Sequence, residues 1–538
     1  MRVLNFTPIL ALSLAACVAS KPTPQPDVHR PAPVPGTTMN LDFKDLKVHE
    51  IAAAEPHKPV KLKLPNGMTG WAVRLPENFP LATPAVANGR MYVGGGFGSY
   101  SFYCIDAKSG ELIWRVQTTD DGPTGAVVSG DYVAYNTESC TLEVRLCSNG
   151  ELVWGRWLGD PLMSQPAIAD GRVVMCWPNH GSFLQENIDP QDDDKLPDSG
   201  EMMPLQQSGE APASGPGPVA KGTVVHGGVK VAGKGSHALG CFDLKTGQTY
   251  WAVGVPGDCI SAPVIEGGRV FAATLDGTLT QVDLKTGKVL AQDAHNATSA
   301  PWVGMLNNEL HAFTSQRETV TETVAGKEVK VHYESTRQFD SRNTAGFAQQ
   351  RMKADWLDRR VVESNTYYGA QSKALQDSGV GFSQAPEAAQ SARAADNVGE
   401  ASIVGLWAFQ GSRPMVQHDR LYNTLGNSIS RGNLDGASVD WQINYRPEKK
   451  ERLLSPPASA GGQLVFASLD GTVFTLDAKT GQVKHALKVN KNFVFQPAVM
   501  DGKLYLSTLD GWLIAIDTGD KALTGWSMWG GGPAHNGR

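Results

Sequence analysis

The chain has 538 residues, a formal net charge of −6, 41% hydrophobic residues and 13 tryptophans. This apolar and aromatic content excludes a wholly disordered chain, and the mildly acidic charge excludes the overall electrostatic footprint of a nucleic-acid-binding protein. Glycine and proline, at 58 and 33 residues, exceed their usual share and indicate many turns between short strands. No apolar run is long enough for a transmembrane helix.

The N-terminus has the layout of a secretion signal. Arg2 precedes an apolar stretch at 9–16, and Cys17 follows three small or apolar residues. This ending resembles a bacterial lipobox, so we expect residues 1–16 to be removed and Cys17 to be acylated; an ordinary signal peptide with a chance cysteine is the alternative. Val18 follows the cysteine in place of the aspartate that retains lipoproteins in the inner membrane. By resemblance to that sorting rule, we expect an outer-membrane protein that faces the periplasm.

Residues 17–64 are predicted to be a lipid-anchored, Pro-rich tether and lead-in. Six prolines lie between Ser20 and Thr37. Such a segment stays extended and cannot pack a core, so we expect it to be disordered.

Six cysteines remain after Cys17, in a compartment that permits disulfides. They could form bridges in any of fifteen pairings, or they could be buried free thiols. Cys140 and Cys147 would be too far apart to pair if one strand held both. The six are Cys104, Cys140, Cys147, Cys176, Cys241 and Cys259.

The rest of the chain repeats a unit of about 40 residues, the length of a propeller blade with four short strands. Each unit has an Asp-x-Lys-Thr-Gly turn or a close variant, in which the aspartate caps backbone N–H groups and the glycine takes a left-handed conformation. A tryptophan that can wedge between neighbouring sheets comes four residues after several of these glycines. The turns are Asp106 to Gly110, Asp243 to Gly247, Asp283 to Gly287 and Asp477 to Gly481, and the tryptophans are Trp114, Trp154 and Trp251.

Units such as 268–287 resemble the PQQ-like (pyrroloquinoline-quinone-type) repeat. The resemblance implies an all-β, eight-bladed β-propeller over residues 65–538. The last unit is short, and the segments 70–76 and 82–87 at the front look like the strands that complete it and close the ring. The segment Trp526 to Arg538 resembles the ending common in this family. The eight units begin near Gly89, Gly130, Gly171, Gly268, Asn307, Asp419, Gly462 and Gly502.

Two insertions interrupt the repeats. The first, at about 178–236, is rich in acidic residues that lack the spacing of a calcium loop, which favours a solvated loop. The second, at about 338–400, has apolar residues at four- to five-residue steps and is predicted to be largely helical. This arm either docks a partner or caps the disc. The residues that suggest the helix are Phe347, Met352, Trp356 and Val361.

The repeat family includes quinoprotein alcohol dehydrogenases, which bind PQQ with calcium. The sequence lacks their adjacent cysteine pair and any Cys-x-x-Cys-His, Gly-x-Ser-x-Gly or P-loop motif, and its histidines have no metal-ligand spacing. We therefore predict no enzyme activity and no catalytic, cofactor-binding or metal-binding residues. PQQ with calcium, bound at a site assembled from distant blades, is the alternative.

A lipid-anchored propeller without a cofactor resembles BamB-type lipoproteins of the outer-membrane β-barrel assembly machine, although this chain is longer. The resemblance implies a scaffold that binds other envelope proteins, and the acidic net charge predicts no nucleic-acid partner. A propeller that binds another envelope protein or a polysaccharide remains the alternative within the class of binding proteins.

Overall fold

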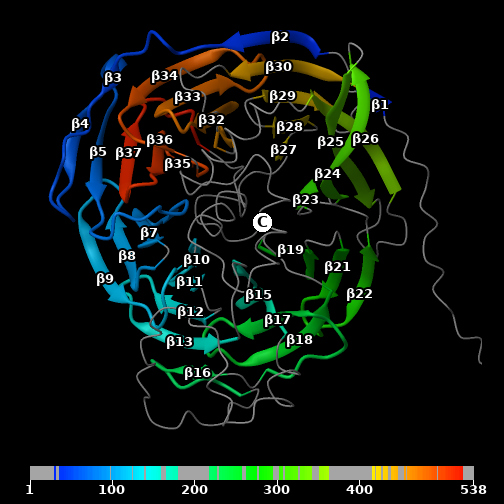
Figure 1. Ribbon diagram of the computed structural model, residues 1–538. Coiled ribbons are helices and arrows are strands. Elements are labelled where there is room, and N and C mark those ends of the chain that lie inside the picture. Colours follow the sequence, from blue (N-terminus) through cyan, green and yellow to red (C-terminus); the bar gives the residue numbers. More distant parts are fainter. Residues whose placement is uncertain are drawn as a thin grey trace, which may run out of the picture.

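The computed structural model describes residues 30–31, 35–179, 217–294, 302–362, 415–445 and 454–524, apart from gaps at 97, 124, 138–140, 159–164, 227–228, 257–261, 275–277, 307–308, 325–326, 342–350, 418–419, 426–427, 434–437, 456 and 494. Over these ranges the protein is all-β, with one short 3-10 helix, η1 (Pro65–Gly67). Its strands form eight sheets, numbered here 1 to 8 in chain order, which lie around a ring (Figure 1).

Sheets 1 to 4 follow one another along the chain, except that the outermost strand of sheet 2 comes from between two strands of sheet 3. Sheet 1 holds β6 (Ala85–Ala87), β7 (Arg90–Gly94), β8 (Ser101–Asp106) and β9 (Leu112–Gln117). Sheet 2 holds β10 (Val127–Ser129), β11 (Tyr132–Asn136), β12 (Thr141–Leu146), β13 (Leu152–Trp157) and β16 (Val224–His226). Sheet 3 holds β14 (Ala167–Ala169), β15 (Arg172–Pro178), β17 (His237–Asp243) and β18 (Thr249–Val255). Sheet 4 holds β19 (Val264–Glu266), β20 (Arg269–Ala273), β21 (Thr278–Asp283) and β22 (Val289–Ala294).

Sheets 5 to 7 each include one strand from the N-terminal part of the chain, and sheet 8 includes two. Sheet 5 holds β23 (Trp302–Leu306), β24 (Glu309–Val324), β25 (Lys327–Ser341), β26 (Arg351–Val362) and β1 (Arg30–Pro31). Sheet 6 holds β27 (Met415–Gln417), β28 (Arg420–Leu425), β29 (Ser428–Asn433), β30 (Val439–Tyr445) and β2 (Pro35–Leu41). Sheet 7 holds β31 (Ala458–Ala460), β32 (Gln463–Ala467), β33 (Thr472–Asp477), β34 (Val483–Val489) and β3 (Val48–His49). Sheet 8 holds β35 (Ala498–Met500), β36 (Lys503–Ser507), β37 (Trp512–Asp517), β5 (Thr69–Arg74) and β4 (Val60–Lys63).

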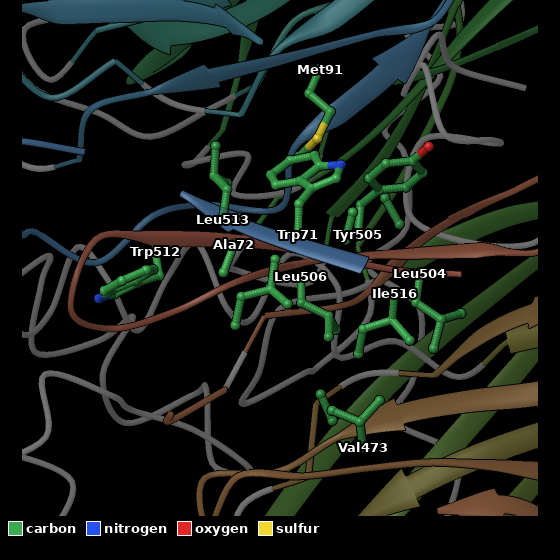
Figure 2. Packing of buried hydrophobic residues seen from close by; sticks show 14 of the residues in the cluster. Trp71, Ala72, Met91, Val473, Leu504, Tyr505, Leu506, Trp512, Leu513 and Ile516 are labelled. Atoms are coloured by element: carbon green, nitrogen blue, oxygen red, sulfur yellow. The ribbon is translucent and has the colours of Figure 1, made fainter. Parts of the chain in front are cut away.

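Sheet 8 joins the two ends of the chain and closes the ring. β5 pairs antiparallel with β37, with Ala72 opposite Ile514. Apolar side chains of this sheet pack toward Met91 of sheet 1 on one side and Val473 of sheet 7 on the other (Figure 2). The predicted pairing of the 70–76 segment with the last unit is therefore present. The prediction that the 82–87 segment completes the last unit is wrong. Its strand, β6, is the inner strand of sheet 1 and pairs with β7.

The predicted tether differs from the structure in its second half. From Pro35 onward the chain forms outer strands rather than an unstructured lead-in, so strands begin well before residue 65. β2 and β3 pair parallel with β30 and β34, and β4 pairs with β5. An outer sheet edge leaves backbone groups open to an extended segment, and an edge tolerates proline. The signal peptide at 1–16 and Cys17 lie outside the described residues.

The predicted helix in the second insertion is a strand where the structure describes it. Residues 351–362 form β26, which pairs antiparallel with β25. Met352 and Trp356 are four residues apart, a spacing that suits both a helical face and one face of a strand, and the long β25 supplies the hydrogen-bonding partner. Residues 338–341 are the end of β25, and the other residues of that insertion, like the acidic part of the first one, lie outside the described residues. The first insertion contributes β16, which pairs parallel with β13.

Candidate interaction surface

The ring has two faces that differ in construction. One, the turn face, is where the first strand of each sheet leads into the second and, except in sheet 8, where the third leads into the fourth. The other, the loop face, holds the connections between second and third strands and between sheets. The longest connections, at 179–236 and 363–414, leave from strands that end on the loop face. Because binding residues gather on loops held by a rigid scaffold, the loop face is the candidate interaction surface.

The repeated aspartate turns on the turn face are capped as expected from their residue types. Asp243 Oδ1 accepts hydrogen bonds from the backbone N–H of Lys245 at 3.0 Å and Thr246 at 2.8 Å, and from the Thr246 hydroxyl at 2.8 Å. Gly247 closes the turn with φ of +65°. The same cap on the third residue is made by Asp106, Asp283 and Asp477, and φ is also positive at Gly110, Gly287 and Gly481.

Each predicted blade tryptophan connects its own sheet to the next one. All three indoles are at most 9% exposed. A Cβ on Gly247 would lie only 2.7 Å from the Trp154 ring, so this glycine is needed for the approach of the indole as well as for the turn. The Nε1 groups of Trp114, Trp154 and Trp251 donate to the carbonyls of Cys147, Leu244 and Leu284 at 3.1, 2.9 and 2.8 Å.

Two further tryptophans make the same contact, and the sequence analysis missed both. Trp71 Nε1 donates to the Ala107 carbonyl at 3.2 Å, from sheet 8 to sheet 1. Trp441 Nε1 donates to the Lys479 carbonyl at 3.2 Å, from sheet 6 to sheet 7. Neither follows an intact Asp-x-Lys-Thr-Gly turn. The sequence signal that would have identified both is a tryptophan in the strand that immediately precedes the next repeat unit.

A buried ion pair fixes the loop between sheets 1 and 2. Glu143 and Arg145 lie 2.7 Å apart, with side chains 0% and 6% exposed. The Tyr135 hydroxyl donates to Glu143 at 2.6 Å, and Glu143 also accepts from the backbone N–H of Thr119 at 2.8 Å. Burial and the neighbouring carboxylate hold the pKa of Tyr135 well above its usual value, so its proton stays on the phenol. The loop backbone is therefore tied to a buried charge.

Two more polar clusters hold other loops of this face. Asp470, after β32, accepts hydrogen bonds from the Ser468 hydroxyl and from the Tyr445 hydroxyl at 3.1 Å, and lies 3.7 Å from Lys488. Burial alone would raise the pKa of Asp470, but hydrogen bonds from Ser468 and Thr472 and the charge of Lys488 lower it overall. The Asp470 side chain therefore stays ionised at the base of its loop.

Between sheets 8 and 1 the corresponding carboxylate is Glu77. It accepts from the Tyr103 hydroxyl at 2.6 Å and from Arg115 at 3.2 Å. Burial raises the pKa of Tyr103 well above its ordinary value, and the hydrogen bond to Glu77 adds to this shift. With the clusters around Glu143 and Asp470, this contact makes the described part of the loop face a fixed frame for its connecting loops.

Cysteines and potential metal ligands can be located only in the part of the chain that the structure describes. There Cys104, Cys147 and Cys241 are buried free thiols, and Cys176 is buried as well. Burial is the main cause that raises the pKa of Cys104 and Cys241 to about 12, so they are protonated and unreactive. No group of three or more potential metal ligands is present among the described residues. No helix in those ranges is long and apolar enough to cross a membrane.

Comparison with known proteins adds a family. A family model described as "Outer membrane protein assembly factor BamB" matches residues 59–143, 102–185, 187–352 and 424–535, well over half of the chain. Two curated proteins of that name are similar: one from Burkholderia pseudomallei (strain K96243), 24% identical over 229 residues, 40% of this chain and 56% of the relative, and one from Yersinia pestis, 24% identical over 209 residues, 35% and 50%. The chain thus spans about half the length of the curated relatives it matches.

Two of the solved structures that resemble the chain are a BamB and an alcohol dehydrogenase. BamB from Moraxella catarrhalis is 13% identical with a TM-score of 0.46, over 86% of this chain and 98% of that chain. A quinohemoprotein alcohol dehydrogenase from Comamonas testosteroni is 13% identical with a TM-score of 0.45, over 85% and 77%.

Sheets in a ring, capped aspartate turns and tryptophans that join one sheet to the next define a β-propeller protein built from PQQ-like repeats. Within that class, the family match is specific. The chain belongs to the family of outer membrane protein assembly factor BamB, and the resemblance predicted from the repeat units is confirmed.

Proposed function

We propose that this protein is a periplasm-facing, lipid-anchored scaffold that binds other envelope proteins during assembly of outer-membrane β-barrel proteins. The observation that carries the proposal is the family match over more than half of the chain. A fixed frame of buried charges under the loop face supports it, because a scaffold needs a surface that loses little conformational freedom on binding.

The proposal includes anchoring through Cys17. The lipobox-like ending before Cys17 supports this, and two or three acyl chains would hold the chain firmly in a bilayer. The anchor would place the protein on the periplasmic side of the outer membrane.

It also includes an eight-bladed architecture, in which each of the eight sheets is one blade. The eight repeat units of the sequence and the sheets of the described residues support this count. Inner strands of successive sheets are neighbours from β6 through β27, and again from β31 through β35 back to β6.

We further propose that the protein acts without PQQ, calcium or another cofactor and is not an enzyme. The sequence offers no adjacent cysteine pair as a stacking platform for a quinone. Calorimetry with PQQ and calcium tests this proposal directly. Saturable binding at micromolar concentration would favour the alternative of a quinoprotein-type enzyme.

Affinity purification from detergent-solubilised outer membrane tests the scaffold function. We expect a subunit of the barrel-assembly machine to co-purify with the tagged wild-type chain. A tagged Cys17→Ser variant, purified at equal expression from a detergent lysate of whole cells beside the wild type, separates binding from membrane attachment, because a direct contact survives loss of the anchor. Purification of the wild-type chain without any assembly subunit would contradict the proposed role.

A further inference from the structure

The segment that leads into β4 is fixed at both of its ends. Before it, Ile51 is 4% exposed, and its backbone N–H donates to Asn490 Oδ1 at 2.8 Å. After it, β4 pairs with β5 in sheet 8, which lies beside sheet 1 on the ring (Figure 1). Between these two points His57 is partly buried, whereas the residues on either side of it are exposed. His57 therefore holds the middle of this segment against the ring.

His57 contacts both neighbouring sheets in a strained backbone conformation. Its N–H donates to the Arg74 carbonyl of β5 at 3.0 Å, and its ring lies 5.6 Å from that of Tyr103 in sheet 1, centroid to centroid. Its φ is +63°, in the left-handed region that costs free energy for a residue with a Cβ. The segment keeps this conformation because its contacts offset the cost, so weaker contacts favour its release.

The surroundings of the His57 ring favour the uncharged imidazole. Among the described residues, its buried Nδ1 has no hydrogen-bond partner. Glu77 Oε1 already accepts from the Tyr103 hydroxyl and from Arg115, and Oε2, although buried, makes no hydrogen bond to His57. Burial and the positive charge of Arg115 lower the pKa of His57, and the carboxylate of Glu77 offsets only part of this shift.

The other charged groups on the elements around His57 do not compensate a proton there. Glu55 and Lys58, on the same segment, are exposed and form an ion pair with each other. Arg74, on β5, contacts His57 through its carbonyl, and its guanidinium has the same sign of charge as an imidazolium. Protonation of His57 therefore places a second positive charge beside Arg115 in a partly buried site.

We propose that His57 is an acid-sensitive latch, which holds residues 52–59 against sheets 8 and 1 at neutral pH and releases them when its ring is protonated. Because the folded-state pKa of His57 is lowered, the contact has its full strength above about pH 6.5, the ordinary pKa of histidine, and weakens as the pH falls through the folded value. Release stops at Ile51 and at β4, which have their own hydrogen bonds. This regulation goes beyond the proposed scaffold function and does not depend on which protein the loop face binds.

Hydrogen–deuterium exchange of the full chain in detergent, between about pH 7.5 and about pH 5.5, tests the latch. Histidine titrates in this range, whereas ordinary carboxylates stay ionised. The readout is the peptide that covers residues 52–59, in which the N–H groups of His57 and Lys58 are hydrogen-bonded. Its rates are corrected for the intrinsic pH dependence of exchange and compared with those of β33.

Three variants separate the effect of this proton from other effects of acid. His57→Gln keeps a polar side chain that cannot gain a proton. Arg115→Gln removes the repelling charge from a side chain that is 48% exposed. His485→Gln is the matched control, because it removes a histidine from β34 and leaves the latch unchanged.

We expect the corrected exchange of residues 52–59 to rise as the pH falls in the wild type and in His485→Gln, while β33 does not change. The rise should be lost in His57→Gln and should be smaller in Arg115→Gln. A wild type without the rise, or an equal rise in His57→Gln, would overturn the proposal. So would slower exchange in acid, because the protonated ring would then pair with Glu77 Oε2 and tighten the contact. Co-purification with an assembly subunit tests the scaffold function separately, so the two proposals fail independently.

Discussion

Trp154 offers the most direct test of how the sheets are held together. Its side chain is 0% exposed, its Nε1 donates to the Leu244 carbonyl at 2.9 Å, and its ring lies 6.2 Å from that of Phe242, centroid to centroid. Trp154→Ala removes the ring between sheets 2 and 3 and leaves a cavity, at a cost of roughly 3–5 kcal/mol. Trp154→Phe keeps an aromatic ring but leaves the carbonyl without its donor, which adds about 1–3 kcal/mol to a smaller packing loss.

Urea unfolding of the full chain in detergent, followed by circular dichroism, measures both effects. Leu112→Ala is the control: this side chain lies on an outer strand and is 36% exposed, so its loss should change stability by less than about 0.5 kcal/mol. We expect the urea midpoint to be highest for Leu112→Ala, lower for Trp154→Phe and lowest for Trp154→Ala. A Trp154→Ala variant as stable as the Leu112→Ala control would refute the role of this indole between sheets.

Four further outcomes follow from the same contacts. Gly247→Ala should destabilise the chain at least as much as Trp154→Phe, because its Cβ would meet the Trp154 ring at 2.7 Å in a turn with φ of +65°; urea midpoints check this. Asp243→Ala should cost about 1 kcal/mol in the same assay, because the turn loses its backbone cap. The folded-state pKa of Asp470 is lowered, so its contribution is present above about pH 4 and is lost as the pH falls through the folded pKa; the wild type should therefore lose stability more steeply on acidification than Asp470→Asn. Cys17→Ser should move the protein from the membrane fraction to the soluble fraction, and a variant still wholly in the membrane fraction after a salt wash would count against the lipid anchor.

Local features of the sequence predicted the repeat and its turns well. Asp243 and Gly247 lie within one turn, so their residue types alone carry its capping and its left-handed backbone. Trp154 could be placed for a related reason, because a fixed distance from the turn glycine fixes its position in the outer strand. Trp71 was missed because its strand lies at the front of the chain, whereas the turn of its own sheet lies near the end.

Local residue patterns could not predict which distant segments pair as neighbouring strands. Residues 35–41 read as a Pro-rich tether, and they become strand β2 only because β30, some four hundred residues later, offers an open edge. Met352 and Trp356 fit a helix until the long β25 is present to pair with them. Period-two and helical patterns are both compatible with a four-residue spacing, so the partner decides the outcome. The loop-face carboxylates were also missed, since Glu143 and Glu77 acquire their roles from residues in a neighbouring sheet.

The N-terminal strands connect the proposed anchor to the closure of the ring. Followed backward from β5, the chain runs through β4, β3, β2 and β1 along the outer edges of sheets 8, 7, 6 and 5. β5 itself pairs with β37, and Trp71 within it donates to sheet 1, so one short strand both completes the last sheet and contacts the first. If Cys17 is held in a membrane, a force applied at Cys17 acts along the chain first on β1 and β2, at the edges of sheets 5 and 6, and only later on β5. The outer strands β1 to β4 therefore lie between the proposed anchor and the contact that closes the ring.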